Sequence, residues 1–149
     1  MLLKLAGAIG AGVLLTALTA LPAGAATNTV TIGAPVTLTY RILVAVPVTV
    51  VCDPVAGTVQ EIDVSVAVTE AVGKKVASGQ ATDASISPQP PLLTCDGVTQ
   101  NHLVVDVIPA GGSPPFRYGG AIIQAGFFIF TDSGNESGNS PYTPVRLVK

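Results

Sequence analysis

Apolar side chains recur at every even-numbered position from residue 36 to residue 52, and the run closes on Cys52, one of only two cysteines. A period of two residues is the signature of a β-strand whose one face packs on a core. We therefore expect this stretch to anchor a β domain, with Val36, Leu38, Tyr40 and the even positions that follow directed inward.

This stretch is too long for an ordinary single strand. It is expected either to divide into two strands near residues 41–45 or to cross as one strand from sheet to sheet. Pro47 has no amide donor, so it must sit at an edge, a bulge or a strand switch.

Further alternating segments, separated by turn residues, follow in the chain. Strands are expected over 27–32, 61–72, 102–108, 121–131 and 142–148, with a weaker strand interrupted by Gly79 and a polar, flexible loop over 131–141. No long segment has a helical period. The sequence predicts an all-β fold, an immunoglobulin-like β-sandwich of about seven or eight strands in a single domain over 27–149. The absence of Trp departs from antibody-type domains.

Residues 1–26 have the pattern of a secretory signal peptide. Lys4 precedes an apolar run, and small residues with an A-x-A site, Ala23-Gly24-Ala25, follow it. An uncleaved membrane anchor is the alternative, although the run is short for a spanning helix. We expect an exported, extracellular protein that meets the membrane only transiently, through this peptide.

Export decides how the two cysteines are interpreted. In an oxidising compartment they predict one disulfide, Cys52–Cys95. Closing this loop stabilises the fold by about 4 kcal/mol in the chain-entropy model.

The charge of the exported part argues against nucleic acid as a partner. Lys4 is one of the seven Lys and Arg residues, so six remain beside nine acids, a formal net charge near −3. Neutralising phosphates needs clustered basic residues, whereas Lys74-Lys75 is the longest basic run.

Catalytic and metal-binding patterns are weak. The single histidine, His102, shares a strand face with Asp106 at a separation of about 13 Å along the strand, too far for a base and its orienting carboxylate. Asp53 and Asp96 each follow a cysteine, so a calcium site is the alternative to two turn-forming aspartates. We predict no catalytic residue, no metal site and no cofactor.

The remaining candidate site is apolar. Aromatic residues are few in this chain, yet they crowd between residues 116 and 130, in a strand that is apolar on both faces. Core packing is the alternative to a cleft or exposed patch for an apolar ligand or a partner. The candidate surface consists of Phe116, Tyr118, Ile122, Phe128 and Phe130.

The order of the segments over residues 46–125 resembles a family of small secreted actinobacterial β-sandwich proteins of unknown function. The residues that carry the likeness are Cys52-Asp53-Pro54, Val66 to Glu70, Ala77-Ser78-Gly79, Thr94-Cys95-Asp96-Gly97, Val104 to Pro109 and Phe116 to Ala125. A weaker similarity, in the Gly/Asn-rich segment 131–141 before a last strand, is to the enediyne-binding apoproteins, which have two disulfides where this chain has one. The first resemblance implies an exported β-sandwich and adds no activity, and the apoproteins are also exported β-sandwiches.

We therefore expect a non-enzymatic secreted protein that acts by binding or surface interaction, with an unidentified protein or cell-surface partner. Two alternatives remain at this point. One is a carrier of a small apolar ligand. The other is an inhibitor of an extracellular hydrolase that presents the loop 109–115 or the loop 131–141.

Overall fold

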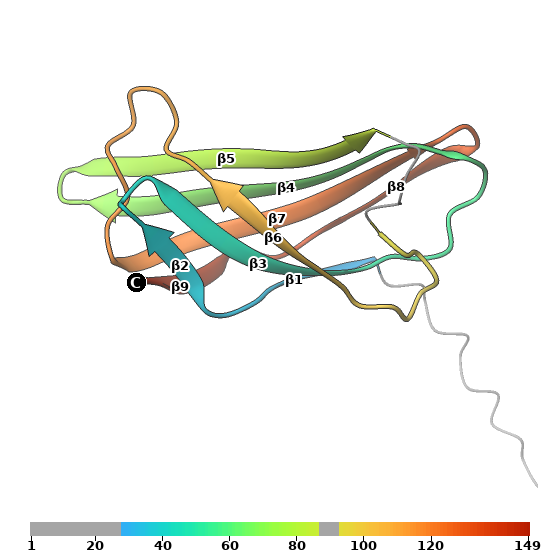
Figure 1. Cartoon of the computed structure of the whole chain (residues 1–149), viewed down its shortest axis with the longest axis horizontal. Helices are drawn as coiled ribbons and strands as arrows, with labels where there is room; N and C mark the ends of the chain where they lie inside the picture. Colours follow the sequence, from blue (N-terminus) through green and yellow to red (C-terminus); the bar gives the residue numbers. More distant parts are fainter. Residues whose placement is uncertain (1–27, 87–92) are drawn as a thin grey trace, which may run out of the picture.

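The computed structural model describes residues 28–86 and 93–149, so the predicted signal peptide lies outside the described residues. Within them the chain forms nine β-strands and no helix (Figure 1). In chain order the strands are β1 (Thr29–Ile32), β2 (Val36–Thr39), β3 (Leu43–Val51), β4 (Val59–Val72), β5 (Lys75–Ile86), β6 (Asn101–Val107), β7 (Gly119–Thr131), β8 (Gly134–Asn139) and β9 (Thr143–Val148).

Backbone pairing joins all nine strands in one continuous sheet, in the order β1-β3-β2-β9-β7-β4-β5, with β6 on β3 and β8 on β7. The sheet folds over itself, because β3 and β6 lie across β4 and β7 (Figure 1). The parallel pair of β2 and β9 joins the two halves. The predicted all-β sandwich is confirmed, with nine strands instead of seven or eight.

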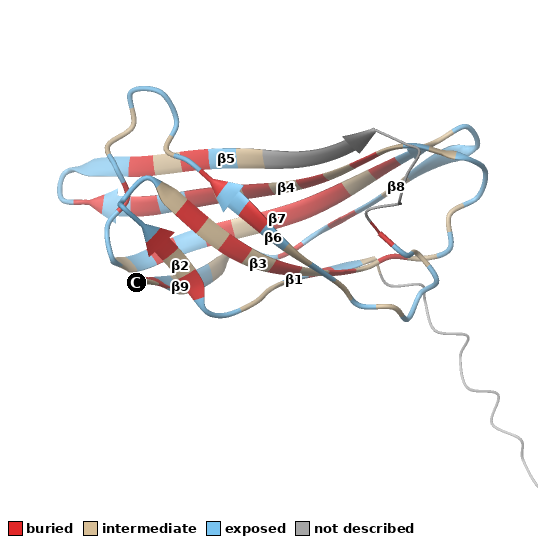
Figure 2. Ribbon diagram, in the orientation of Figure 1, coloured by how far each residue is buried: buried red, intermediate tan, exposed pale blue. Residues whose placement is uncertain are grey.

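The core lies between these two layers and follows the alternation in the sequence. In β3, and in β4 from Ile62 onward, the even positions are buried and the odd positions are at least partly exposed (Figure 2). Burial of each such side chain contributes roughly 1.5 to 3 kcal/mol. The buried apolar residues of the two strands are Val44, Val46, Val48, Val50, Ile62, Val64, Val66, Val68 and Val72.

The long alternating stretch is two strands, the first of the two predicted arrangements. β2 and β3 form a hairpin whose turn is residues 40–42. Tyr40 and Ile42 are therefore not core residues, as their even positions predicted, but are 86% and 56% exposed at the turn.

Pro47 lies inside β3, where the partner on one edge of the strand changes from β1 to β2. At this gap the backbone N–H of Gly33 donates to the carbonyl of Pro47 over 2.8 Å. The other edge of β3 pairs with β6, opposite Val104. Of the three predicted settings, the place where the strand changes partners accommodates the missing donor.

The prediction of a flexible loop over 131–141 is wrong. Residues 134–139 form β8, which pairs with β7 from Gly126 to Thr131. The pairing uses backbone groups, so a strand at this edge of the sheet needs few apolar side chains of its own.

Candidate functional site

The two ends of the sandwich differ in chemistry. We call one of them the basic end: it comprises the β2–β3 turn (40–42), the β4–β5 turn (73–74), the β6–β7 loop (108–118) and the last residue, Lys149. The disulfide end comprises the segments around Cys52 and Cys95 and the β7–β8 turn (132–133). The two ends lie at opposite extremes of the long axis (Figure 1).

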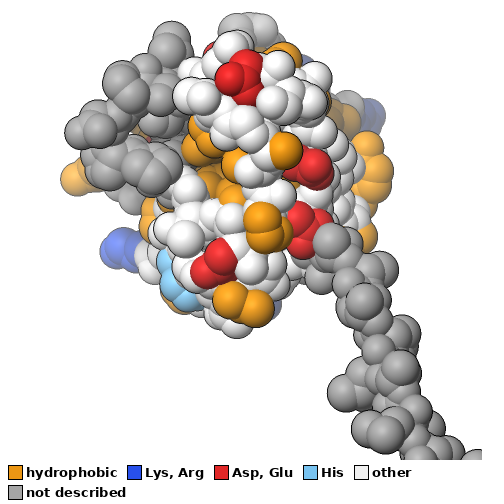
Figure 3. All heavy atoms as spheres, turned by 90° about the vertical axis from the view of Figure 1, so that its right-hand side faces the viewer, with side chains coloured by type: hydrophobic (Ala, Val, Ile, Leu, Met, Phe, Trp, Pro, Cys, Tyr) orange, Lys and Arg blue, Asp and Glu red, His pale blue; other side chains and the backbone are white. Residues whose placement is uncertain are grey.

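Charge is segregated between these ends. All six Lys and Arg residues after residue 27 lie at or beside the basic end, in its turns, in its loop and in the last residues of β9. Carboxylates gather on the disulfide end, which faces the viewer in Figure 3. A protein with more acids than bases therefore presents a positive surface at one end. The six basic residues are Arg41, Lys74, Lys75, Arg117, Arg146 and Lys149.

The β2–β3 turn holds two residues in the left-handed region. Tyr40 has a φ of 51° and Arg41 a φ of 63°, and the N–H of Ile42 donates to the carbonyl of Thr39 over 3.1 Å. This is the pattern of a type I′ turn, where Asn and Gly are favoured. A left-handed residue other than Gly costs roughly 1 to 2 kcal/mol. The turn is therefore strained, and it places an exposed tyrosine and an arginine at its tip.

Two open grooves flank this turn. The tyrosine groove, of about 450 Å³, is lined by Tyr40, Arg41, Tyr118 and Lys149 above the β2 residues Leu38 and Thr39. The isoleucine groove, of about 420 Å³, is lined by Ile42 from the turn and by Ile108, Ala110 and prolines of the β6–β7 loop. Apolar and basic side chains therefore share one tip, with Ile108 61% and Tyr118 48% exposed.

Contacts with the core and with strands β4 and β5 hold the β6–β7 loop in place. Phe116 is fully buried in the core, and the N–H of Arg117 donates to Oε2 of the buried Glu70 over 2.8 Å. The loop packs directly against Gly79 of β5, where a Cβ would collide with the carbonyl oxygen of Ile108. The glycine expected to interrupt a weak strand instead permits this close approach.

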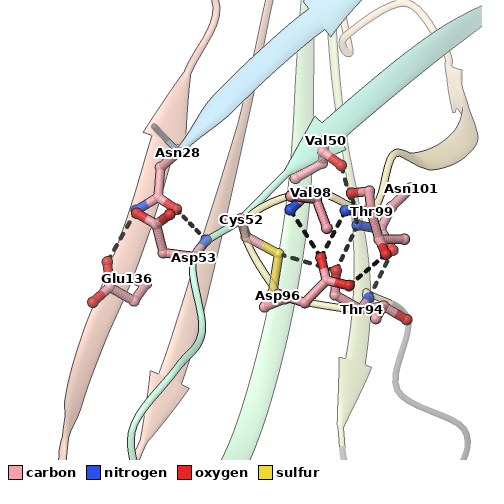
Figure 4. Close-up of a disulfide and its surroundings, with 11 residues drawn as sticks. Asn28, Val50, Cys52, Asp53, Thr94, Asp96, Val98, Thr99, Asn101 and Glu136 are labelled. Atoms are coloured by element: carbon pink, nitrogen blue, oxygen red, sulfur yellow. Dashed lines mark hydrogen bonds between the residues drawn. A yellow bond between two sulfur atoms is a disulfide. The ribbon is translucent and has the colours of Figure 1, made fainter. Parts of the chain in front are cut away.

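The disulfide end is held by the predicted bond and by turn hydrogen bonds (Figure 4). Cys52 and Cys95 are joined, with their Cα atoms 4.7 Å apart. Asn101 accepts from the N–H of Thr94 over 2.7 Å and donates to the carbonyl of Val50 over 3.1 Å. Asn101 therefore connects Thr94, directly before Cys95, with Val50 of β3.

Asp96 and Asp132 at this end accept hydrogen bonds from backbone N–H groups. Asp96 accepts from the hydroxyl and N–H of Thr99, at 2.6 Å each, and from the N–H of Val98 at 2.9 Å. These bonds, led by the Thr99 hydroxyl, lower the pKa of Asp96 from 3.8 to about 2. The N–H of Thr58 likewise lowers the pKa of Asp132. Asp96 therefore stabilises a turn, which is one of the two roles expected for it from the sequence.

Asn28 links three segments at the same end. Its amide nitrogen donates to Glu136 of β8, and its amide oxygen accepts from the N–H of Asp53, each over 2.9 Å (Figure 4). Within residues 28–86 and 93–149 no group of three or more His, Cys, Asp or Glu side chains could hold a metal ion. His102 lies on the exposed face of β6, with Nδ1 at 3.0 Å from the hydroxyl of Thr49.

The predicted apolar surface is not one surface. Phe116 belongs to the core, whereas Tyr118 lines the tyrosine groove at the basic end. Ile122 lies on the outer face of β7, with Phe128 and Phe130 farther along the same face. The rings of Phe128 and Phe130 pack at 4.3 Å between centroids with a tilt of 52°. The strand that is apolar on both faces thus buries one face and leaves the other partly exposed.

Sequence reasoning missed Tyr40 and Arg41 as surface residues. The sequence does contain an indication of a turn here. Tyr40 and Arg41, a tyrosine with a polar hydroxyl and a cation, lie next to each other within a stretch that is too long for one strand. In the described part of the chain no helix is long and apolar enough to cross a membrane. Comparison of the chain with protein-family models, curated proteins and solved structures finds no match.

Proposed function

We propose that this is a secreted, non-enzymatic binding protein that docks its basic end on an anionic membrane surface. The observation that carries the proposal is the convergence of all six basic residues with exposed tyrosine and isoleucine side chains at one end of the fold. The proposal goes beyond the expectation that the chain meets a membrane only through residues 1–26.

The charge at this end is sufficient for reversible attachment. Each Lys or Arg near an anionic lipid surface contributes about 1 kcal/mol, and a cluster of four to eight such residues is typical of anionic-lipid binding. Two acids lie near this cluster. Glu70 is buried and accepts a hydrogen bond from the N–H of Arg117, whereas Asp106 of β6 is exposed two residues before the β6–β7 loop. Six basic residues outnumber these two acids, so the basic end keeps a positive formal charge.

Exposed apolar side chains add a second contribution. Tyrosine is favoured at the membrane interface because its ring is apolar and its hydroxyl is polar. Tyr40 and Ile42 project from the strained turn, and Ile108 lies beside them across the isoleucine groove. Insertion of such side chains below the headgroups increases affinity in proportion to the apolar area buried.

Secretion is supported by two observations. The disulfide is consistent with an oxidising compartment, and residues 1–26 carry the pattern of a signal peptide. The protein would therefore meet membranes from outside the cytosol.

Vesicle sedimentation tests the proposal. We expect the protein to bind vesicles that contain both phosphatidylglycerol and phosphatidylcholine, and not to bind vesicles made only of phosphatidylcholine. Binding should weaken as salt is added. The double variant Arg41→Gln/Arg117→Gln is expected to lose about 30-fold in affinity, because it removes about 2 kcal/mol of attraction.

A matched control separates position from net charge. Gln60→Glu/Gln100→Glu lowers the net charge by the same amount, but at exposed positions of the disulfide end. This variant is expected to bind vesicles like the unchanged protein. Equal loss in both variants, or no selectivity for the anionic lipid, would overturn the proposal in favour of another partner such as an acidic protein.

The inhibitor alternative has lost one of its two loops, because residues 134–139 are a strand. Its other loop, 109–115, belongs to the basic end and lines the isoleucine groove. The carrier of a small apolar ligand stays a prediction.

A further inference from the structure

A second groove lies on the outer face of the sheet, where β4, β7 and β8 run side by side. It has a volume of about 330 Å³, and its lining includes Asp63, Ser65, Phe128, Ser137 and Asn139. It begins about 30 Å along β4 from the turn at the basic end. The groove is therefore separate from the docking surface proposed above.

Register places these residues in two rows of three. Asp63, Phe128 and Ser137 are directly opposite one another across the three strands. In the next row, Gly126 lies between Ser65 and Asn139. Neighbouring strands are about 4.8 Å apart and successive residues of one face about 7 Å apart, so the two rows cover about 10 Å by 7 Å, which is enough for one sugar ring with its hydroxyls.

Gly126 makes the hollow. A Cβ at this position would collide with Oδ1 of Asn139, so the Asn139 side chain reaches over the glycine. Phe128 rises beside this floor, and its ring is supported by Phe130 at 4.3 Å. The groove thus combines an aromatic wall with an amide and two hydroxyls.

Among the described residues, Asp63 has the one buried side-chain polar atom that lacks a hydrogen-bond partner, the carboxylate oxygen Oδ1. Native structures rarely leave a buried acceptor unpaired, because desolvation without a replacement bond is costly. Asp63 also lines the groove, so a turn of its side chain toward the groove would let a ligand's donor form a charge-assisted hydrogen bond with the carboxylate.

We propose that this groove binds a hexopyranose unit of a neutral glycan. The carboxylate of Asp63 and the amide of Asn139 would bond sugar hydroxyls, and Phe128 would pack against the apolar C–H face of the ring. One carboxylate without a nearby cation disfavours anionic ligands, and a single carboxylate among hydroxyls and an amide is a poor site for calcium. A neutral ring with many hydroxyl groups suits all five lining side chains, because four of them can form hydrogen bonds and the fifth is aromatic.

Titration followed by amide NMR tests the site. The probes are the methyl glycosides of glucose, mannose and galactose, added separately to the isotope-labelled protein. We expect at least one of them to shift the amide signals of Gly126, Ser137 and Asn139. Asp63→Asn and Phe128→Ala are each expected to weaken that response about tenfold.

Ile122→Ala is the matched control, because Ile122 lies on the same outer face of β7 but outside the groove. It is expected to bind the glycoside like the unchanged protein. Unchanged signals with all three glycosides, equal weakening in the control, or shifts produced by calcium alone would each overturn the proposal. Vesicle binding is expected to persist in the Asp63 and Phe128 variants, so the two proposals fail independently.

Discussion

The backbone N–H of Arg117 donates a hydrogen bond of 2.8 Å to the carboxylate of Glu70, which is only 4% exposed. This bond sets the direction in which the chain leaves the β6–β7 loop, directly before Tyr118 enters the tyrosine groove. An internal charge of β4 therefore shapes the surface of the basic end.

Replacing Glu70 with Ala is expected to reduce the free energy of unfolding by about 1 to 3 kcal/mol, because the N–H of Arg117 loses its acceptor. Glu70→Gln retains a carbonyl oxygen and is expected to lose less than Glu70→Ala. Urea denaturation measures both. An alanine variant as stable as the unchanged protein would show that the bond does not hold the loop.

The strained turn predicts a conflict between stability and binding. Tyr40→Asn/Arg41→Gly supplies residues that accept positive φ, so the free energy of unfolding should rise by about 1 to 2 kcal/mol. The same variant removes a ring and a charge from the tip, so it should bind anionic vesicles more weakly.

Tyr142→Asn is the control for this variant, because Tyr142 is 73% exposed and is not in the left-handed region. Its stability should change by less than about 0.5 kcal/mol. A turn variant that is destabilised would argue against strain at residues 40 and 41.

Loss of the disulfide should destabilise the fold without altering the basic end. Cys52→Ala/Cys95→Ala is expected to lose about 4 kcal/mol, which denaturant unfolding measures directly. Under conditions where the variant stays folded, its affinity for anionic vesicles should equal that of the unchanged protein. A large loss of affinity in the folded variant would show that the two ends are coupled.

Asp96 should contribute to acid sensitivity. Its pKa in the fold is about 2, below the ordinary value of 3.8, mainly because the Thr99 hydroxyl stabilises the charged form. Its stabilising contribution is therefore complete above about pH 4 and is lost as the pH falls toward 2. Melting temperatures across this window should fall less steeply in Asp96→Asn than in the unchanged protein, and parallel curves would contradict this assignment.

Much of the fold could be predicted from period-two alternation and the cysteine pair. β4 has the residues Val64, Val66 and Val68 on its buried face, as its alternation indicates. β8 could not be predicted, because Gly134–Asn139 has no apolar face and pairs through its backbone with β7. Pairing of this kind depends on which strand edge is available, and a local sequence pattern does not contain that information.

The hairpin turn shows why alternation misplaced part of the site. Leu38 pairs with Val44, and both are buried, so even positions face inward before and after the turn. The alternation therefore runs unbroken through residues that have left the sheet. Tyr40 matched the inward pattern by position although the turn exposes it. The charge segregation was equally hidden, because the six basic residues are spread over the sequence from 41 to 149.

The most direct test of the central claim is the orientation of the protein on an anionic membrane. Amide signals would be recorded in the presence of phosphatidylglycerol nanodiscs that carry a paramagnetic headgroup label. We expect the strongest broadening in the β2–β3 turn and the β6–β7 loop, around Tyr40 and Tyr118, and the weakest around Cys95 and Asp132. Uniform broadening, or broadening strongest at the disulfide end, would contradict docking through the basic end.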